Sequence, residues 1–190
     1  GLDVLLENHL DLLYRKRIAL VTNHSGIDKN GIPNIVQLYT KNVIKLETIF
    51  TPESDVNQQG ISDGTLIKKQ NHTQIEKIFT PEHGFTGNIP AGEFVDNDSI
   101  HSELPSVISL YGKIKKPTHE MLENIDLIIY DIQDIGARFY TYISTLGLVM
   151  EAAGEANIPV IVLDRPNPIG GNIDGPILHE NFKSFIGKYP

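Results

Sequence analysis

Polar and titratable side chains follow four apolar stretches of the sequence, each at the point where the stretch ends. They are Asn23 and His24; Glu82 and His83; Asp131, Gln133 and Asp134; and Asp164, Arg165 and Asn167. Each of them alone fits a turn or a helix cap. If the stretches are parallel strands, however, all four groups meet at one edge of the sheet, where ligands bind. That concentration of carboxylates, imidazoles, amides and a guanidinium predicts a functional site.

Glu82 is the strongest candidate for a general acid. Pro81 restricts the backbone before it, and Gly84 allows the chain to turn after it. A carboxyl group held at a strand end beside apolar Phe85 would have its pKa raised, as a general acid requires. The alternative is a glutamate that begins a helix, where the helix dipole favours it. His83 could adjust the acidity of Glu82, form a hydrogen bond with a substrate or stabilise the turn.

Arg138, Tyr140 and Tyr142 alternate along the chain. In an extended segment all three side chains would face one way. Tyrosine rings stack on the apolar faces of sugars, and an arginine can bind a carboxylate through two parallel hydrogen bonds. The alternative is structural: the tyrosines cover the sheet edge, and Arg138 pairs with Asp134 one helical turn earlier.

Apolar strands that alternate with helices are expected to position these side chains. Helices are predicted over 2–14, 34–39, 117–123 and 141–156. Strands are predicted over 18–22, 43–50, 75–80, 107–111, 127–130 and 160–163. The polar stretch 54–74 is expected to be a surface excursion. This order predicts one doubly wound α/β domain over residues 1–190, with a mostly parallel sheet.

Composition excludes several classes of protein. The chain has 190 residues and no cysteine, which excludes disulfides, thiolate zinc sites, iron–sulfur clusters and a cysteine nucleophile. A formal charge of −8 disfavours a general nucleic-acid binder, and no apolar run reaches the roughly 18 residues of a membrane span. Gly-x-Gly-x-x-Gly, P-loop, Gly-x-Ser-x-Gly and His-Glu-x-x-His motifs do not occur. We therefore expect no cofactor, although a metal site built from His24, His83 and an aspartate stays an alternative.

A set of motifs resembles one protein family. In chain order they are Val21-Thr22-Asn23-His24-Ser25-Gly26, Thr80-Pro81-Glu82-His83-Gly84-Phe85, Ser109-Leu110-Tyr111-Gly112, Asp131-Ile132-Gln133-Asp134-Ile135-Gly136-Ala137-Arg138-Phe139-Tyr140-Thr141-Tyr142 and Leu163-Asp164-Arg165-Pro166-Asn167-Pro168. These motifs, in this order, are similar to those of the NamZ-type exo-β-N-acetylmuramidases, nearly from end to end of the chain. One departure lies between two Ile-Phe-Thr-Pro-Glu copies, where residues 54–74 resemble an insertion.

The resemblance implies a Rossmann-like N-terminal domain without a dinucleotide, whose cleft is closed by a smaller C-terminal domain that residues 1–190 do not include. The implied activity is release of N-acetylmuramic acid from the non-reducing end of peptidoglycan fragments, in an extracytoplasmic compartment. Two alternatives stay open: a non-catalytic module that binds peptidoglycan fragments, and a metal-dependent hydrolase.

The same resemblance assigns roles to residues. Glu82, in Pro-Glu-His-Gly, matches the proposed catalytic glutamate, with His83 beside it. Glycosidases use a second carboxyl group, at about 5–5.5 Å for retention or about 6.5–9.5 Å for inversion. Here Asp131, Asp134 or Glu93 could supply it, or the substrate's acetamido group could replace a nucleophile, so the stereochemical outcome is left open. Arg138 or Arg165 would bind the lactyl carboxylate of muramic acid. The expected substrate-binding set is Asn23, His24, Glu93, Tyr111, Gln133, Arg138, Tyr140, Tyr142, Asp164, Arg165 and Asn167.

Overall fold

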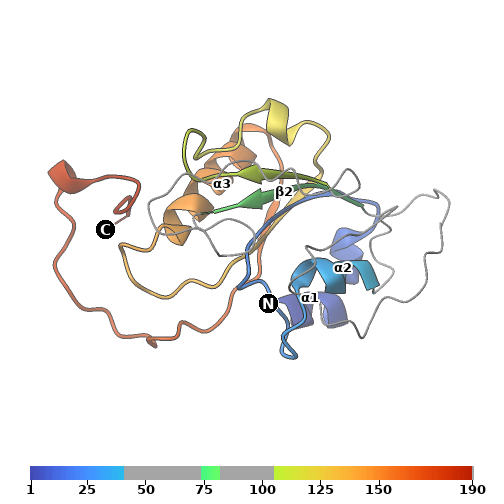
Figure 1. Ribbon diagram of the computed structural model, residues 1–190, viewed down its shortest axis with the longest axis horizontal. Helices are drawn as coiled ribbons and strands as arrows, with labels where there is room; N and C mark the ends of the chain where they lie inside the picture. The colour runs from blue at the N-terminus through green and yellow to red at the C-terminus, as the bar shows by residue number, and fades with distance from the viewer. Residues whose placement is uncertain (41–73, 82–104, 190) are drawn as a thin grey trace.

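A computed structural model describes residues 1–40, 74–81 and 105–189 of the chain. These residues form a parallel sheet in the order β3-β2-β1-β4-β5 (Figure 1). The strands are β1 (Arg17–Thr22), β2 (Gln74–Thr80), β3 (Ser106–Ser109), β4 (Leu127–Asp131) and β5 (Val160–Val162). Every described strand pair is parallel. The predicted doubly wound, Rossmann-like α/β class is confirmed.

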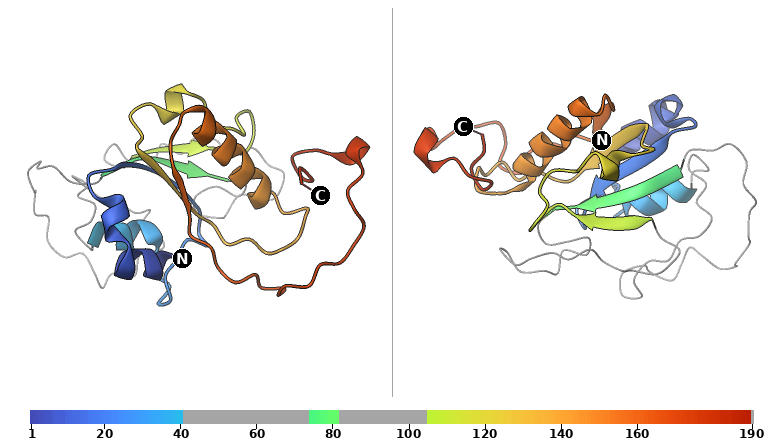
Figure 2. Two further views of the ribbon diagram at one scale, coloured as in Figure 1. Left: turned by 180° about the vertical axis from the view of Figure 1, so that it is seen from behind. Right: turned by 90° about the horizontal axis from the view of Figure 1, so that it is seen from above.

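Helices cover both faces of this sheet because strand residues alternate between two cores. Ile18 and Leu20 of β1 belong to the core beneath α1 (Leu2–Asn8) and α2 (Asn34–Thr40). Ala19 and Val21 face the opposite core, against α3 (Tyr142–Glu155). The views in Figures 1 and 2 show α1 and α2 on one side of the sheet and α3 on the other. Strands buried on both faces explain why the sequence shows apolar runs instead of polar–apolar alternation.

Two predicted helices are shorter than expected. The helix predicted over 2–14 is interrupted at His9, whose φ of −136° is not helical, so α1 is followed by the 3₁₀ helix η1 (Leu10–Leu13). The helix predicted over 117–123 is reduced to the 3₁₀ turn η2 (Glu120–Leu122), because Glu123 is extended with ψ 136°. The strand predicted over 43–50 lies outside the described residues, as does the stretch 54–73; Gln74 is the first residue of β2.

An ion pair fixes the amino ends of the two central strands. Arg17, the first residue of β1, pairs with Asp126, just before β4, at 2.8 Å between Nη2 and Oδ1. The Arg17 backbone N–H and Nε also donate to Asp126 Oδ2, at 2.9 and 3.0 Å. These bonds hold the pKa of Asp126 well below its usual range, at about 2. The pair therefore reinforces the β1–β4 pairing from which the opposite edge is built.

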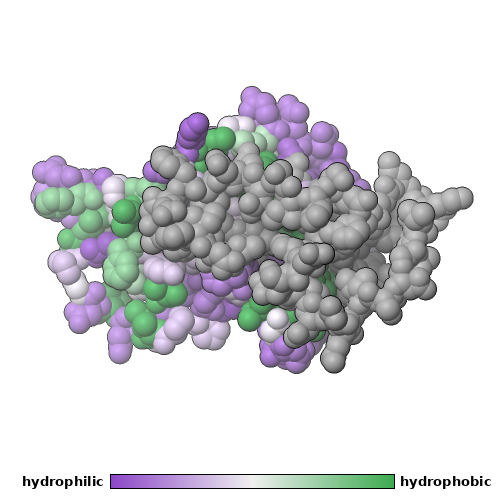
Figure 3. Space-filling view, viewed as in Figure 1, coloured by the Kyte–Doolittle hydropathy of each residue, from purple (hydrophilic) through white to green (hydrophobic). Residues whose placement is uncertain are grey.

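The chain leaves the sheet after β5 as a long arm, residues 166–189, whose regular structure is the 3₁₀ helix η3 (Glu180–Phe182) (Figures 1 and 2). Apolar side chains of this arm are exposed, among them Ile173 at 100% and Ile177 at 87%. In Figure 3, apolar residues at this end of the molecule lie at the surface among hydrophilic ones. The arm returns to the body at Phe185, whose ring lies 6.0 Å from that of Tyr111.

Candidate active site

The carboxyl edge of the sheet carries the cluster of polar side chains. The chain passes from β1 outward to β2 and β3, then returns to the other side of β1 with β4 and β5. Such a reversal opens a crevice between the two strands that diverge, here β1 and β4. The register places Thr22, the last residue of β1, opposite Asp131, the last residue of β4. Of the polar strand exits predicted from sequence, those of β1 and β4 therefore lie side by side at the topological switch point.

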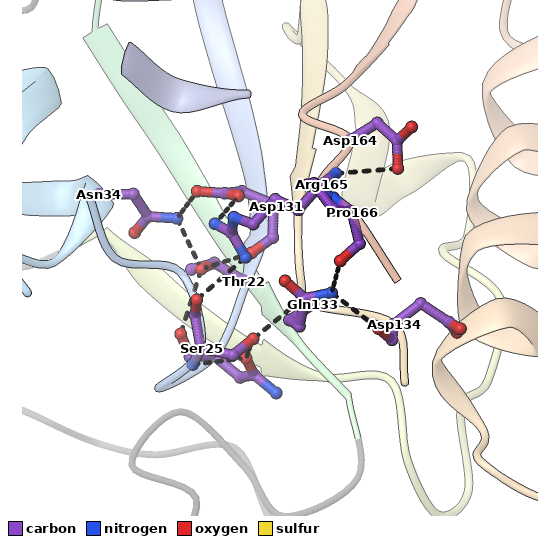
Figure 4. A network of polar contacts seen from close by, with 10 residues as sticks. Thr22, Ser25, Asn34, Asp131, Gln133, Asp134, Asp164, Arg165 and Pro166 are labelled. Atoms are coloured by element: carbon purple, nitrogen blue, oxygen red, sulfur yellow. Dashed lines mark hydrogen bonds and ion pairs between the residues drawn. The ribbon is translucent and has the colours of Figure 1, made fainter. Parts of the chain in front are cut away.

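Asp131 is fully buried at this point, and both of its carboxylate oxygens are occupied (Figure 4). Oδ1 forms an ion pair with Nη2 of Arg165, and Oδ2 accepts a hydrogen bond from Asn34 Nδ2 at 2.8 Å. Burial raises the pKa of the Asp131 carboxyl, while the Arg165 guanidinium and the Asn34 amide act against that rise. Because both oxygens face donors, the ionised carboxylate is the form that this site accommodates.

Ser25 connects the exits of β1 and β4. Its Oγ donates to Asn23 Oδ1 at 2.6 Å and accepts from the backbone N–H of Gln133 at 2.9 Å. The carbonyl of Ser25 accepts from Arg165 Nη1 at 3.0 Å. Asn23 is buried, and its Nδ2 donates to the Tyr142 hydroxyl at 3.0 Å. The first turn of α3 is thus tied to the same loop.

The exits of β4 and β5 are joined in turn. Gln133 Nε2 donates to the carbonyls of Asp134 at 2.7 Å and Pro166 at 3.3 Å. Gly136 has a φ of 77°, and a Cβ there would overlap the side chain of Asn167. This close approach requires glycine and places Asn167 directly over the turn after β4. Asp134 is half-buried, and its Oδ1 accepts from the Gly136 N–H at 2.6 Å.

The segment that holds Arg138 and the two tyrosines is a turn, not the extended segment in which they would share a face. Tyr140 N–H donates to the Ala137 carbonyl at 2.9 Å, and Tyr142 begins α3. Tyr142 is buried, with the Tyr140 ring edge-on to it at 4.9 Å. Arg138 is exposed and donates to the Pro176 carbonyl at 2.7 Å. These tyrosines therefore contribute to packing, while Arg138 faces outward.

Three hollows lie along this edge of the described structure. The first, about 650 Å³, is lined by Asp134, Arg138, Asn167 and Lys188, with apolar Ile143 and Ile169. The second, about 270 Å³, shares Asp134 and Asn167 with the first and adds Asp164, Arg165 and apolar side chains of α3 and β5. The third, about 530 Å³, is lined by Ser25, Gln133 and Arg165 on the other side. Shared residues join the hollows into a trough that offers carboxylates, amides and cations to a ligand.

The remaining predicted site residues divide into two groups. His24 is exposed beside Asn23, Asp164 is exposed next to Arg165, and Tyr111 is half-buried beyond β3. Glu82, His83 and Glu93 lie outside the described residues. Among the residues that are described, no group of three or more His, Asp or Glu side chains could hold a metal ion. No helix in the same ranges is long and apolar enough to cross a bilayer.

Sequence reasoning missed the residues that hold the others in place. In the sequence Asn34 is only the first residue of the helix predicted over 34–39, yet its Nδ2 donates to Thr22 Oγ1 at 2.7 Å as well as to Asp131. Ser25 belongs to the same polar run as Asn23 and His24, and this position in the sequence was the signal that could have identified it as a site residue. Gly26 allows the side chains of Thr22 and Asn34 to lie against the backbone, since a Cβ at this position would overlap Thr22 Oγ1 and Asn34 Nδ2.

Comparisons with known proteins agree on one family. Residues 53–190 match the family described as exo-β-N-acetylmuramidase NamZ, N-terminal. Over its whole length the chain is 42% identical to the peptidoglycan β-N-acetylmuramidase NamZ of Bacillus subtilis (strain 168) and covers 39% of it. The chain thus spans about two fifths of that relative.

Solved structures of DUF1343 family proteins from Bacteroides fragilis NCTC 9343 are also similar. One has a TM-score of 0.73 and 40% identity, with 100% of this chain and 40% of that chain covered. Another has a TM-score of 0.66 and 32% identity, with 96% of this chain and 39% of that chain covered.

Proposed function

The chain belongs to the NamZ family of exo-β-N-acetylmuramidases, whose N-terminal part it matches, and on this premise we propose that it forms the catalytic domain of a glycosidase. This enzyme releases N-acetylmuramic acid from the non-reducing end of peptidoglycan fragments. The observation that carries the proposal is 42% identity over the whole chain to a peptidoglycan β-N-acetylmuramidase. The trough at the carboxyl edge supports it, because open parallel sheets bind ligands there.

The chemistry needs one protonated carboxyl group and a second carboxyl group across the scissile bond. Glu82, next in the sequence after buried Pro81, is the proposed general acid. For the second group the surroundings favour Asp134 over Asp131. Asp131 is fully buried and committed to Arg165 and Asn34, whereas Asp134 lines two hollows. Glu93, outside the described residues, is the remaining candidate.

Recognition of muramic acid is assigned to Arg138. The lactyl ether of this sugar ends in a carboxylate that N-acetylglucosamine lacks, and a guanidinium binds a carboxylate through paired hydrogen bonds. Arg165 is already paired with Asp131, whereas Arg138 lines the 650 Å³ hollow with its charge bound only to a backbone carbonyl among the described residues. Lys188, on the same hollow, adds a second positive charge.

A further domain is proposed to complete the cleft. The chain covers 39% of its Bacillus relative, and the family description assigns the matching part to the N-terminus. Closure by that domain would exclude water and strengthen each electrostatic contact with the sugar. Because peptidoglycan lies outside the cytoplasmic membrane, we place the enzyme in an extracytoplasmic compartment.

The test uses the full-length protein that carries this chain, a chromogenic N-acetylmuramide and the matching N-acetylglucosaminide. We expect turnover of the muramide with a much higher kcat/KM than for the glucosaminide. Activity should survive exhaustive chelation, because the proposed acid and second carboxyl need no metal. Loss of activity on chelation would favour a metal-dependent hydrolase. Binding of the muramide without product release would favour a non-catalytic binding module.

A further inference from the structure

The buried ion pair between Asp131 and Arg165 lies at the trough, where Arg165 lines two of the hollows and Asp131 lines none of the three. The Asp131 side chain is 0% exposed and the Arg165 side chain 16% exposed. Arg165 uses Nη2 for Asp131 and Nη1 for the Ser25 carbonyl, so two of its guanidinium nitrogens are bound within the protein. Both carboxylate oxygens of Asp131 have a partner within the protein, Arg165 for Oδ1 and Asn34 for Oδ2, and burial keeps the side chain away from a ligand.

The pair joins four separate parts of the fold (Figure 4). Asp131 ends β4, Arg165 follows β5, Ser25 follows β1 and Asn34 begins α2. No described backbone ladder links the β1 exit to the β5 exit, since β4 lies between these strands. Arg165, in the loop after β5, therefore reaches across the end of β4 and bonds Ser25 in the loop after β1.

The groups that face the trough are neighbours of this pair in the sequence. Asp164 precedes Arg165, Asn167 follows it by two residues, and both line the 270 Å³ hollow. Gln133, just beyond Asp131, lines the 530 Å³ hollow, and Arg165 lines both. Moving the guanidinium would therefore shift the rims of two hollows together.

Stability alone does not explain such a pair. Removing two charges from water costs free energy that their attraction only partly returns, and apolar replacements of buried ion pairs are often as stable. What a buried pair provides is a defined geometry, because each charge accepts only its own partner in one arrangement. At a crevice whose walls are loops, that geometry is what a ligand would require.

We propose that Asp131 and Arg165 are positioning residues, whose ion pair holds the exit loops of β1 and β5 against the end of β4 so that the rims of the trough keep their shape. The proposal rests on the glycosidase function and revises two expected roles, a catalytic one for Asp131 and a substrate-binding one for Arg165. Neither side chain touches the sugar in this assignment. Both act through Gln133, Asp164 and Asn167.

The fold supplies a matched control at the other end of β4. Arg17 and Asp126 also form an arginine–aspartate pair that joins β4 to a neighbour, but at the amino edge, away from the trough. Asp131→Asn and Asp126→Asn each remove one charge from such a pair. If the Asp131–Arg165 pair acted only on stability, the two variants would have the same kcat per folded molecule.

The kinetic test compares these variants in the full-length protein with a chromogenic N-acetylmuramide. Misplacement by about 1 Å can cost about 100-fold in rate, so we expect Asp131→Asn to lower kcat by about 10- to 100-fold with little change in KM. Asp126→Asn should keep the wild-type kcat. Arg165→Lys, which retains the charge but not the fork of donors, should fall between wild type and Arg165→Met.

A second measurement does not need activity. The Gln133 amide donates to Ser25 Oγ, so its hydrogen exchange reports whether the two loops stay together. Faster exchange of this amide in Asp131→Asn than in Asp126→Asn supports positioning, even if the glycosidase assignment fails because wild type does not hydrolyse the muramide. Equal exchange and equal kcat in the two variants would overturn the proposal. A raised KM with unchanged kcat in Arg165→Met would instead make Arg165 a substrate ligand.

Discussion

Asp131 and Asp134 lie close together in the sequence but have opposite surroundings. The first is enclosed by a guanidinium and an amide, whereas the second faces two hollows, and among the described residues no lysine or arginine pairs with it. On these surroundings we propose a structural role for Asp131 and a catalytic role for Asp134. The distinction rests on burial and partners, which residue type alone does not reveal.

The first prediction concerns Asp134. If its carboxylate is the second catalytic group, Asp134→Asn should lower kcat for the muramide by about 10²–10⁴-fold, the usual contribution of a positioned acid or base. The control is Asp174→Asn, because Asp174 lines the 650 Å³ hollow in the exposed arm. Steady-state kinetics of both variants decide the matter. A near-normal kcat in Asp134→Asn would contradict this role and leave Glu93 or the substrate's own acetamido group as the second catalytic group.

The second prediction concerns selectivity. Arg138→Ala should narrow the kcat/KM preference for the muramide over the glucosaminide, because only the muramide offers a carboxylate to the guanidinium. Arg138→Lys should retain part of the preference, since it keeps the charge but not the paired donors. Arg15→Ala, at an exposed position on the opposite edge, serves as control. An unchanged ratio in Arg138→Ala would make Arg138 a support for the arm through Pro176.

Among the elements, strands were predictable from sequence because they are buried on both faces. The runs over 18–22, 75–80 and 127–130 match β1, β2 and β4 closely, and the first and third end at polar residues that build the described site. Short helices were less predictable. An isolated turn gains little from its own hydrogen bonds, so packing decides whether η1 and η2 extend.

The contacts within the site were not predictable from the same pattern. The pairing of Asp131 with Arg165 depends on strand order. Because β5 lies beside β4, Arg165, which follows β5, comes close to Asp131 at the end of β4. The alternation of Arg138, Tyr140 and Tyr142 would give a shared face in an extended segment, but the chain turns there and enters α3. A period of two residues indicates a common face only where the backbone is extended.

The third prediction concerns the pairing of β1 with β4. The pKa of Asp126 is lowered to about 2 by its bonds to Arg17, so its ionised form is more stable in the folded protein than in the unfolded chain. This stabilisation is present above the usual aspartate pKa and is lost as the pH falls toward 2. Wild type should therefore exceed Asp126→Asn in thermal midpoint at pH 6, and the difference should shrink below about pH 4. A difference that is constant with pH would exclude the ion pair as its source.

On the scale of the whole molecule, the arm at 166–189 is the most incompletely packed part of the described structure. Ile173, Ile177 and Phe182 are exposed at 100%, 87% and 74%. Apolar side chains gathered in this way favour association with another surface. In the full-length protein the proposed further domain would supply that surface.

The fourth prediction follows from this exposure. The 190-residue chain should self-associate through the arm, and Ile173→Lys with Ile177→Lys should shift it toward monomer in sedimentation velocity. Val4→Lys, at another exposed apolar side chain outside the arm, is the matched control and should leave association unchanged. A monomeric wild-type chain with full hydrolytic activity would show that neither a partner surface nor a second domain is needed.

The most direct test of the account is the turnover of a chromogenic N-acetylmuramide by full-length wild type, Glu82→Gln and Glu53→Gln. Glu82 and Glu53 end the two identical Ile-Phe-Thr-Pro-Glu segments, but only Glu82 is followed by His-Gly. We predict that Glu82→Gln lowers kcat by about 10²–10⁴-fold with a smaller change in KM, as expected for loss of a general acid, and that Glu53→Gln has wild-type kinetics. Near-normal turnover by Glu82→Gln, or equal loss in both variants, would contradict the account.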